Sequence, residues 1–570
     1  MPTYAFDEAQ AQLASGVREV LGEPIDVAVA TPPAGVDADL AVPCFALASK
    51  LRQPPEEIAR RLAEHMPPLG LLEQPVAEHG YLNAHFNRAA YGKMVMEDIT
   101  RLGARYGSGE EGEGMTVVLD ISSPNVARPM SVGHLRSTII GDALRRLYAF
   151  SGYRAIGVNH YADWGTQFGT LLYGMTQWLD EAAYRQAPVR ELLRIYVKFD
   201  EDARADPTLR ERAREWALRL EQGDAEARRM WEEIVRVSLA EFNKTYDLLG
   251  VTFDSWRGES AYLELSAEVI DEAVSKGVAV EDQGALIVPL DDAGIETPLI
   301  LRSSDGRTLY HTRDVAAAIY RIKTYHPSRL IYVVGADQRL HFRQLFATLR
   351  KLGYTGVDYV HVDFGLMTLP EGRMSTRRGR VVFLEDVIQE AISRARALVE
   401  KNPDLSDTEK DEVARIVGVG AIKYADLSQS RGKNIVFDWD RMLSLDGDSA
   451  PYLQYTYVRA RGIMRRGTAP YPAGGIDRRA MERSEEWALI KHLARFPVAV
   501  REAARSYHPH LVANYLFGLA QAFHVFYHNV PVQQAEDESL RASRMAIVQA
   551  CAQVMQTGLG LLGIRVPERM

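Results

Sequence analysis

The stretch that most constrains the fold is residues 115–161. Residues 115–121 (MTVVLDI) form a short apolar run rich in β-branched residues, which predicts a buried strand. A turn-forming Ser-Ser-Pro-Asn cluster follows, and apolar residues then recur at helical spacing from Leu135 onward. Gly152 ends this predicted helix, and residues 154–161 predict a second strand. The pattern is a βαβ unit, whose parallel strands require a right-handed crossover.

The loop of this unit predicts an anion-binding site. Gly133 and His134 lie at the start of the helix, where free backbone N–H groups and the helix dipole favour a negative charge. Gly133 has no side chain, so a ligand could lie directly against the backbone. The loop matches neither the Gly-x-Gly-x-x-Gly fingerprint of dinucleotide sites nor the Gly-x-x-x-x-Gly-Lys-Ser/Thr phosphate loop, which argues against an NAD-dependent dehydrogenase.

Composition indicates an ordinary globular protein of several domains. A chain of 570 residues is too long for one core, and its apolar fraction of 46% and charged fraction of 25% are typical of soluble proteins. Cys44 and Cys551 lie far apart, which argues against a disulfide framework or a Cys-rich zinc site and fits a reducing compartment. The first ten residues carry acids and no apolar core, and no apolar run reaches membrane-spanning length. We expect a cytoplasmic protein without a membrane partner or a dedicated metal site.

The net charge of −9 argues by itself against a nucleic-acid partner, but the distribution of charge does not. Residues 451–570 hold 15 Lys and Arg against 9 Asp and Glu, a net charge of +6, which leaves −15 for residues 1–450. A basic block at one end of an acidic chain suggests a polyanionic partner at that end. A solvated basic domain without such a partner would explain the charge equally well.

Two motifs resemble the signatures of class I aminoacyl-tRNA synthetases. Residues 131–134 (SVGH) resemble His-x-Gly-His, with Ser131 in place of the first histidine. Residues 372–379 (GRMSTRRG) resemble the mobile Lys-Met-Ser-Lys-Ser loop, with Arg373 and Thr376 in place of the lysines. The flanking segments SPNVARPM and LRSTIIGD closely resemble arginyl-tRNA synthetases, and the resemblance runs through the terminal LLGIRVPERM. It covers nearly the whole chain.

The resemblance implies a multidomain α/β fold with a fixed domain order. We expect a small α+β N-terminal domain that contacts tRNA (1–110), a Rossmann-like parallel-sheet catalytic domain (111–385) with a helical insertion at about 178–296, a helical connector (386–450) and an all-helical anticodon-binding bundle (451–570). The glycine-rich, acidic stretch YGSGEEGEG before the catalytic domain predicts a linker. No editing domain is expected, because polar readout of a guanidinium already discriminates well.

The resemblance also implies the reaction. An arginine–tRNA ligase would form arginyl-adenylate from arginine, ATP and Mg²⁺, and would then transfer the arginyl group to the terminal ribose of its tRNA. His134 would donate a hydrogen bond to ATP near the reacting phosphate, and Ser131 could donate a weaker one in place of the missing histidine. Arg128 stands at an upstream position where arginyl enzymes are thought to use a lysine. The other residues implied to bind ATP are Gly133, Arg373, Met374, Ser375, Thr376, Arg377 and Arg378.

Five polar residues lie where ligands of open parallel sheets bind. Asp120 and Asn125 follow the first predicted strand, Tyr310 and Asp314 lie four apart at the start of a predicted helix, and Gln338 follows a later strand. All five match the amino-acid-binding positions of the arginyl family. We expect Asp314 to bind the substrate guanidinium and Asp120 the α-ammonium, because burying a cation requires a carboxylate. Asn125, Tyr310 and Gln338 would orient the substrate.

Both ends of the chain are expected to contact tRNA. Residues 76–86 predict one strand that carries Tyr81 and Asn83, an aromatic ring and an amide that could stack on and hydrogen-bond an unpaired base. The resemblance implies a similar role for the C-terminal bundle up to Met570. Two further strands are predicted on either side of the Ser-Ser-Asp-Gly turn at 303–306.

Two alternatives of related kind stay open. One is a class I synthetase for another amino acid, although two acids in the predicted crevice argue against an acidic or aliphatic substrate. The other is a catalytically inactive, tRNA-binding paralogue, which Ser131 suggests because it interrupts the first signature. A monomer is expected in each case.

Overall fold

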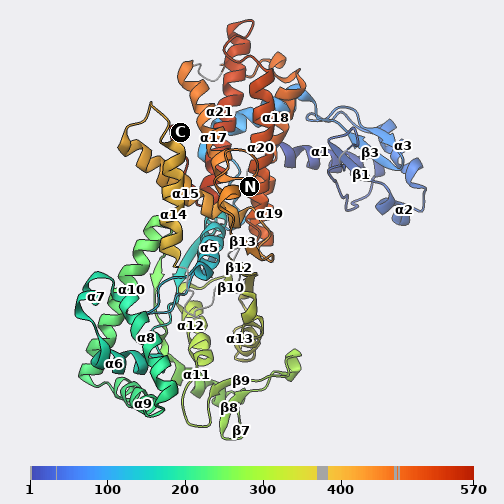
Figure 1. Cartoon of the computed structure of the whole chain (residues 1–570). Coiled ribbons are helices and arrows are strands. Elements are labelled where there is room, and N and C mark those ends of the chain that lie inside the picture. Colours follow the sequence, from blue (N-terminus) through green and yellow to red (C-terminus); the bar gives the residue numbers. More distant parts are fainter. Residues whose placement is uncertain (1–2, 34, 369–382, 468–471, 473–474) are drawn as a thin grey trace.

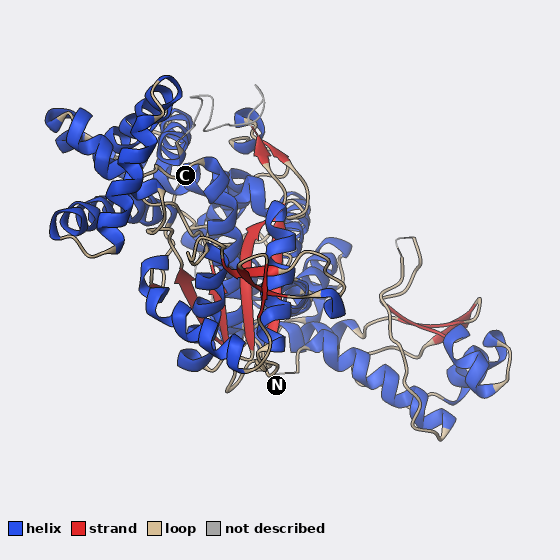
Figure 2. Ribbon diagram, turned by 90° about the horizontal axis from the view of Figure 1, so that it is seen from below, coloured by secondary structure: helices blue, strands red, loops and turns tan. Residues whose placement is uncertain are grey.

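The structure is a computed structural model that describes residues 3–33, 35–368, 383–467, 472 and 475–570. Figure 1 shows a parallel-sheet domain, a helical bundle above it, and a small N-terminal unit beside the bundle. Helices cover both faces of the central sheet (Figure 2). Among the described residues, no helix combines the length and apolar character needed to cross a membrane.

The central sheet has the strand order β11-β10-β4-β5-β6, and all its pairings are parallel. Strand β4 is connected to β5 through α5, so the predicted βαβ unit is confirmed. Because β4 has β5 on one side and β10 on the other, the chain reverses its direction of winding here, and such a switch point is where open sheets bind ligands. The elements are β4 (Thr116–Asp120), α5 (Val132–Phe150), β5 (Arg154–Asn159), β6 (Ser255–Trp256), β10 (Arg329–Gly335) and β11 (Asp358–Phe364).

Alternate residues of β4 enter two different cores. Val117 and Leu119 belong to the cluster that contains the buried face of α5, whereas Val118 belongs to the cluster built with α12 (Tyr310–Tyr325) and α13 (Arg339–Lys351). This alternation follows from the two-residue period of a strand. Helix α5 lies very close to the strand, since a Cβ at Gly141 would stand 2.5 Å from the Ile121 side chain. Only glycine permits this approach.

The segment after β5 is mostly helical, as predicted. It comprises α6 (Gln167–Trp178), α7 (Glu181–Gln186), α8 (Pro188–Ala205), α9 (Thr208–Glu221) and α10 (Ala225–Leu249). Strand β6 then pairs with β5, so the chain returns to the central sheet inside the range 178–296 that was expected as insertion. A second excursion follows, with η2 (Glu259–Tyr262), α11 (Leu263–Ser275), η3 (Asp291–Ala293) and an antiparallel sheet of β7 (Val280–Asp282), β8 (Ala285–Val288) and β9 (Leu299–Arg302).

The prediction of a strand after the 303–306 turn is wrong. Only Thr308 forms an isolated bridge to Arg302, and Tyr310 already begins α12. The first turn of this helix is anchored to β9, because the Thr312 hydroxyl donates to the Leu301 carbonyl at 2.5 Å. A tertiary contact therefore overrides the β propensity of this short segment.

The N-terminal unit is a small α+β domain, as expected, but residues 76–86 form a hairpin rather than one strand. Strands β2 (Val76–Glu78) and β3 (Tyr81–Ala84) flank His79 and Gly80, both of which have positive φ. Such a pair makes a tight turn that the apolar pattern did not reveal. Strand β1 (Leu40–Pro43) pairs with β3, and the helices are α1 (Ala5–Leu21), α2 (Phe45–Leu51), α3 (Pro55–His65), α4 (Arg88–Leu102) and η1 (Gly103–Arg105).

The predicted linker at 106–114 is packed at its start. Tyr106 is buried, stacks on Phe496 with ring centroids 6.2 Å apart, and donates from its hydroxyl to the Leu493 carbonyl. A Cβ at Gly107, which has positive φ, would lie 2.7 Å from the Phe496 ring. Glycine is therefore used here for close contact with the bundle as well as for its backbone conformation.

The C-terminal part is helical, as predicted. Its helices are α14 (Leu384–Val399), α15 (Asp407–Leu427), α16 (Trp439–Met442), α17 (Ala450–Arg466), η6 (Arg478–Met481), α18 (Ser484–Ala494), α19 (Phe496–Ser506), α20 (His510–Asn529) and α21 (Glu538–Leu561). The short strands β12 (Met367–Thr368) and β13 (Ile435–Val436) pair in parallel and join the sheet domain to the segment after α15.

A buried arginine connects these regions. Arg136 of α5 and Asp426 of α15 are each 1% exposed and form a bidentate ion pair, with Nη2 at 2.9 Å from Oδ1. The remaining guanidinium N–H groups donate to the backbone carbonyls of Gly365, Arg431 and Lys433. One side chain thus holds together the helix after the 131–134 loop, the end of the sheet and the connector to the bundle.

This arrangement predicts a large loss of stability in Asp426→Asn. The amide has nearly the same shape but no charge, so the Arg136 cation would stay buried without a counter-ion, at a cost of about 3–5 kcal/mol. We expect a clearly lower midpoint of urea-induced unfolding, measured by circular dichroism. Glu502→Gln is the matched control, because its Arg505 partner is 81% exposed and such a surface pair contributes at most about 1 kcal/mol. Equal midpoints for the two variants would contradict the prediction.

Candidate active site

The loop after β4 is strained and is held in place by three hydrogen bonds to α5 and α10. Ser122, Ser123 and Ala127 all have positive φ, which non-glycine residues rarely adopt. The Ser122 backbone N–H donates to the Ser137 hydroxyl of α5, its hydroxyl is 2.6 Å from that of Tyr246 of α10, and the Ala127 N–H donates to Ser238. Strain that is stabilised in this way is typical of functional sites.

His134 lies at the N-terminus of α5 with one ring nitrogen already in use. The backbone N–H of Ser131 donates to His134 Nδ1 at 3.0 Å, and the Ser131 hydroxyl lies 3.2 Å from the same atom. Burial lowers the pKa of His134 below its usual value, so the ring is neutral near pH 7. A neutral ring that accepts at Nδ1 carries its proton on Nε2. Within the described part of the chain Nε2–H has no hydrogen-bond partner, so it can donate to an anionic ligand, and the exposed Gly133 leaves the loop open.

Asp120 is already paired. Its Oδ2 lies 2.8 Å from Nη2 of Arg321, which is 3% exposed in α12, and its Oδ1 accepts from the Ser123 hydroxyl. Burial opposes the charge of Arg321, but the nearby Asp120 outweighs it and raises the pKa of the guanidinium. The carboxylate expected to bind an α-ammonium therefore shares its charge with a residue of the chain.

Asp314, in contrast, faces two histidines. His341 Nε2 lies 2.9 Å from Oδ2 and His160 Nε2 lies 3.4 Å from Oδ1. Burial alone would raise the pKa of Asp314, but the contacts with His160 and His341 outweigh it and hold the pKa below its usual range. The carboxylate is thus anionic at any pH near neutrality.

The surroundings of Asp314 leave several buried polar atoms without a partner. These are His160 Nδ1, His341 Nδ1 and the Tyr332 hydroxyl, among the described residues. The Tyr310 ring, which is 46% exposed, stands 5.4 Å from the His341 ring. Buried polar groups are nearly always hydrogen-bonded, so orphaned groups around a carboxylate are consistent with a polar ligand.

The other predicted residues lie around the same edge of the sheet. Asn125 forms a backbone bridge to Ala162, and Gln338 ends the 3-10 turn η4 (Ala336–Gln338) directly after β10. The Arg128 guanidinium lies over the Tyr196 ring at 4.6 Å and has no carboxylate within 4.0 Å among the described residues. Residues 373–378, predicted to bind ATP, lie outside the described residues.

The sequence did not single out three residues that contact the two acids, namely His160, His341 and Arg321. His160 lies in the NHYADWG segment next to the first βαβ unit, which was noted only as part of the resemblance. His341 and Arg321 lie within helices whose patterns look ordinary, so no local signal could have identified them. Among the described residues, no group of three or more His, Cys, Asp or Glu side chains could hold a metal ion.

The residues predicted to contact tRNA differ in their exposure. Tyr81 is 41% exposed and packs edge-on against the exposed Phe45, with centroids 5.3 Å apart. Asn83 is buried and its amide donates to Glu78. Met570 lines a cavity of about 410 Å³ together with Arg465 and Arg569. The structure thus presents Tyr81 and Met570 to solvent or a cavity, but not Asn83.

Family models and known proteins agree on what this chain is similar to. The model described as "tRNA synthetases class I (R), catalytic domain" matches residues 99–439, "DALR anticodon binding domain" matches 453–570, and "Arginyl tRNA synthetase N terminal domain" matches 6–86. The arginine–tRNA ligase of Clostridium perfringens is 43% identical over 96% of this chain and 97% of its own length, and that of Halothermothrix orenii is 41% identical over 96% of both. The structure of Thermus thermophilus arginyl-tRNA synthetase is similar over 100% of both chains, with a TM-score of 0.84 and 28% identity.

The burial of His311 beside His341 also predicts a pH dependence of stability. Burial and the neighbouring His341 lower the pKa of His311 from 6.5 to about 4. Because the unfolded chain then takes up the proton first, His311 reduces stability as the pH falls from 6.5 toward 4. We expect the midpoint of urea-induced unfolding of His311→Gln to rise relative to that of the unmodified chain as the pH is lowered from 8 to 5. The exposed His65→Gln is the control, and an equal pH dependence for all three proteins would refute the prediction.

Proposed function

The chain belongs to the class I arginyl-tRNA synthetase family, so its function is the ligation of arginine to tRNA, and from this premise we propose how its own residues carry out the reaction. One observation supports the proposal above the rest. The helix N-terminus at His134 and the anionic carboxylate of Asp314, which contacts His160 directly after β5, lie at the same edge of one parallel sheet. The first suits a triphosphate and the second a cationic amino acid.

We propose that ATP binds at the N-terminus of α5. His134 would donate its Nε2–H to a phosphate oxygen near the reacting phosphorus, and the unpaired Arg128 would contact the triphosphate. The Ser131 backbone N–H fixes the His134 tautomer, so the histidine that the family motif has at position 131 is not needed for this task. Mg²⁺ would arrive with ATP as part of the substrate and offset the phosphate charge. Arg373, Arg377 and Arg378 remain candidates for the departing pyrophosphate.

The proposed chemistry needs no protein nucleophile. A carboxylate oxygen of arginine attacks the α-phosphorus, the bond to the β-phosphate oxygen breaks, and pyrophosphate leaves. A hydroxyl of the terminal ribose of tRNA then attacks the carbonyl carbon and releases AMP. Both steps depend on positioning and on donors directed at developing charge, which the fixed Nε2–H of His134 and the helix N-terminus supply.

We propose that Asp314 is the principal carboxylate for the substrate guanidinium. It is anionic, and its ion-pair partners among the described residues are histidines, of which His160 can release its proton when a stronger cation arrives. Asp120 could accept the α-ammonium only while sharing its charge with Arg321. Its contribution to arginine affinity should therefore be smaller than that of Asp314. Tyr310, Gln338 and Asn125 would orient the substrate.

We propose that tRNA follows the basic C-terminal block. In the bundle, the Arg459 guanidinium lies 4.7 Å from the rings of both Tyr455 and Tyr527 and contacts His524. Such an aromatic and cationic cluster suits unpaired bases. At the other end of the chain, the exposed Tyr81 and Phe45 rings suit a further base, with Asn83 supporting the strand from within. The buried, unpaired thiols of Cys44 and Cys551 are consistent with work in the reducing cytoplasm.

The decisive experiment is ATP–pyrophosphate exchange and aminoacylation with each of the twenty amino acids, with tRNA present. We expect activity with arginine alone. Activity with a different amino acid would redirect the proposal to another specificity. No activity with any amino acid, while tRNA still binds, would support the inactive paralogue that Ser131 suggests.

Asp314→Asn tests the assignment of the guanidinium site. A hydrogen bond to a charged group contributes about 1.5–3 kcal/mol, so we expect the KM for arginine to rise about ten- to a hundredfold or more, with little change in the KM for ATP. Discrimination against citrulline, a neutral isostere, should shrink in this variant and persist in Asp120→Asn. Asp305→Asn, an exposed change shortly before α12, is the control. Loss of discrimination in Asp120→Asn alone would show that the two roles are reversed.

A further inference from the structure

Asp163 is a buried acid that the chemistry proposed above does not use. Its side chain is 2% exposed, and it lies three residues after His160 in the segment that leaves the carboxyl end of β5. One residue occupies both of its carboxylate oxygens. Oδ1 accepts from the Ser260 backbone N–H at 2.8 Å, and Oδ2 accepts from the Ser260 hydroxyl at 2.7 Å. The Asp163 side chain therefore fixes Ser260, and with it the turn η2, against the end of β5.

The two segments joined by Asp163 lie unusually close together. A Cβ at Gly258 would stand 2.3 Å from Asp163 Oδ2 and 2.5 Å from the Tyr161 ring, so a side chain at this position would force one of them to move. Directly after this glycine, the Glu259 backbone N–H donates to the Tyr161 carbonyl. Residues 160–163 and 258–260 thus form one tightly joined unit, although they are far apart in the sequence.

This unit contacts Asp314 from two sides. His160 comes from the first segment, and its Nε2 lies 3.4 Å from Asp314 Oδ1. The Tyr262 ring of η2 lies against His160, with ring centroids 5.4 Å apart. Glu259, the first residue of η2, accepts from Nε of Arg313 at 2.8 Å, and Arg313 directly precedes Asp314. A shift of η2 would therefore disturb both neighbours of the Asp314 carboxylate.

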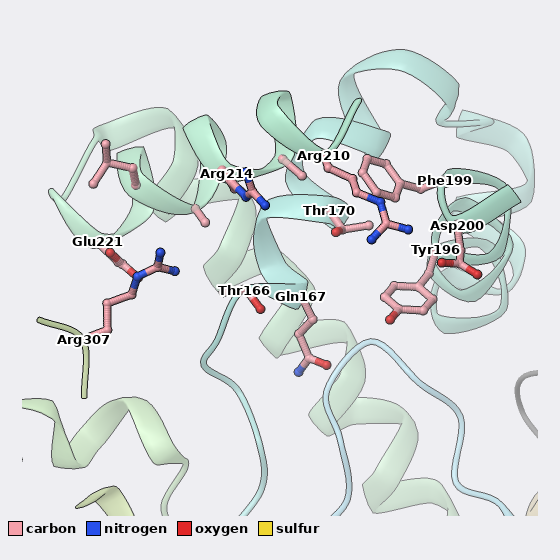
Figure 3. A pocket seen from close by; sticks show the side chains of 13 residues that line it. Thr166, Gln167, Thr170, Tyr196, Phe199, Asp200, Arg210, Arg214, Glu221 and Arg307 are labelled. Atoms are coloured by element: carbon pink, nitrogen blue, oxygen red, sulfur yellow. The ribbon is translucent and has the colours of Figure 1, made fainter. Parts of the chain in front are cut away.

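The first segment is packed on one side only. Trp231 of α10 donates from Nε1 to the Asp163 carbonyl at 2.7 Å, and its ring packs edge-on against Trp164. Further along, a Cβ at Gly165 would meet no atom within 4 Å, and Thr166 lines a cavity at α9 of about 500 Å³ that α6 and α8 also line (Figure 3). With open space beside it, the segment depends on hydrogen bonds more than on close packing to keep its position.

We infer that Asp163 is a positioning residue for the arginine site. Through Ser260 it holds η2, and η2 keeps His160 and Arg313 in place beside Asp314. The inference rests on the proposed function, because it takes Asp314 as the carboxylate that binds the substrate guanidinium. Loss of the two hydrogen bonds should weaken arginine binding and its discrimination from citrulline, and it should leave the ATP site at the N-terminus of α5 unchanged.

The test measures ATP–pyrophosphate exchange by the full chain with tRNA present. Asp163→Ala removes both hydrogen bonds, and Ser260→Ala removes only the one from the hydroxyl. Asp163→Asn keeps both, since its amide oxygen can accept from the Ser260 N–H and its NH₂ group can donate to the hydroxyl. Asp254→Ala is the matched control, because Asp254 joins the segment before β6 to β5 in a similar way, by accepting from the Gly157 N–H at 2.8 Å.

We expect Asp163→Ala to raise the KM for arginine about tenfold or more, because it loses hydrogen bonds to a charged group, and Ser260→Ala to raise it about two- to tenfold. The preference for arginine over citrulline should fall in the same order. The KM for ATP and kcat should stay unchanged in both variants. Asp163→Asn should restore a KM for arginine close to that of the unmodified chain, and Asp254→Ala should not alter it.

Several outcomes would overturn the inference. A fall in kcat, or an equal loss of arginine and ATP affinity, would show that Asp163 only supports the fold. An Asp163→Asn variant as impaired as Asp163→Ala would show that the charge acts and the hydrogen bonds do not. If Asp163→Ala does not fold, an unchanged KM for arginine in Ser260→Ala decides against the inference. An unmodified chain without arginine-dependent exchange would instead refute the proposed function.

Discussion

The ion pair between Arg136 and Asp426 is the interaction on which the rest of the structure depends. Both side chains are almost completely buried, and every guanidinium N–H that could be left unpaired has a carbonyl or carboxylate partner. Such a pair need not add net stability, because desolvating two charges costs much of what their attraction returns. Its effect is geometric. Arg136 lies two residues after His134, so its hydrogen bonds to the accepting carbonyls of Gly365, Arg431 and Lys433 fix where the start of α5 stands relative to the sheet and the connector.

A second constraint comes from the helical insertion. The loop after β4 adopts positive φ at three non-glycine positions, a conformation that the chain would not keep unaided. Two of the groups that hold it, Tyr246 and Ser238, belong to α10. Helix α10 therefore supports the loop of the candidate site, even though the helix adds no strand to the central sheet. The same segment contributes Tyr196, whose ring contacts the Arg128 guanidinium and also lines the cavity at α9.

Features encoded by local patterns were predictable from the sequence. The βαβ unit, the helices of the bundle and the helix start at Gly133 and His134 follow from periodicity and from single residues with one structural use. Pairings between distant segments were not predictable. The sequence shows Asp120 and Asp314 as two similar acids, but only the fold brings Arg321 to the first and His160 and His341 to the second. The hairpin was missed because the apolar pattern did not reveal the tight turn at His79 and Gly80. The early start of α12 was missed because a tertiary contact overrode the β-strand pattern.

The different partners of the two acids have a consequence for how a cationic substrate is bound. The Arg321 guanidinium already forms an ion pair with Asp120, so the two acids do not present two free negative charges when no substrate is bound. The charge of Asp314 is stabilised by its contacts with His160 and His341, and the His160 imidazole, unlike a guanidinium, can lose its proton. Burial lowers the pKa of His160, but its contact with Asp314 outweighs that effect and raises it. If Asp314 binds the arginine side chain, as we propose, a charged His160 is no longer needed, and the histidine can release its proton instead of repelling the substrate. This group of residues stays close to electrical neutrality both without and with a bound arginine, which avoids the cost of a buried uncompensated charge in either state.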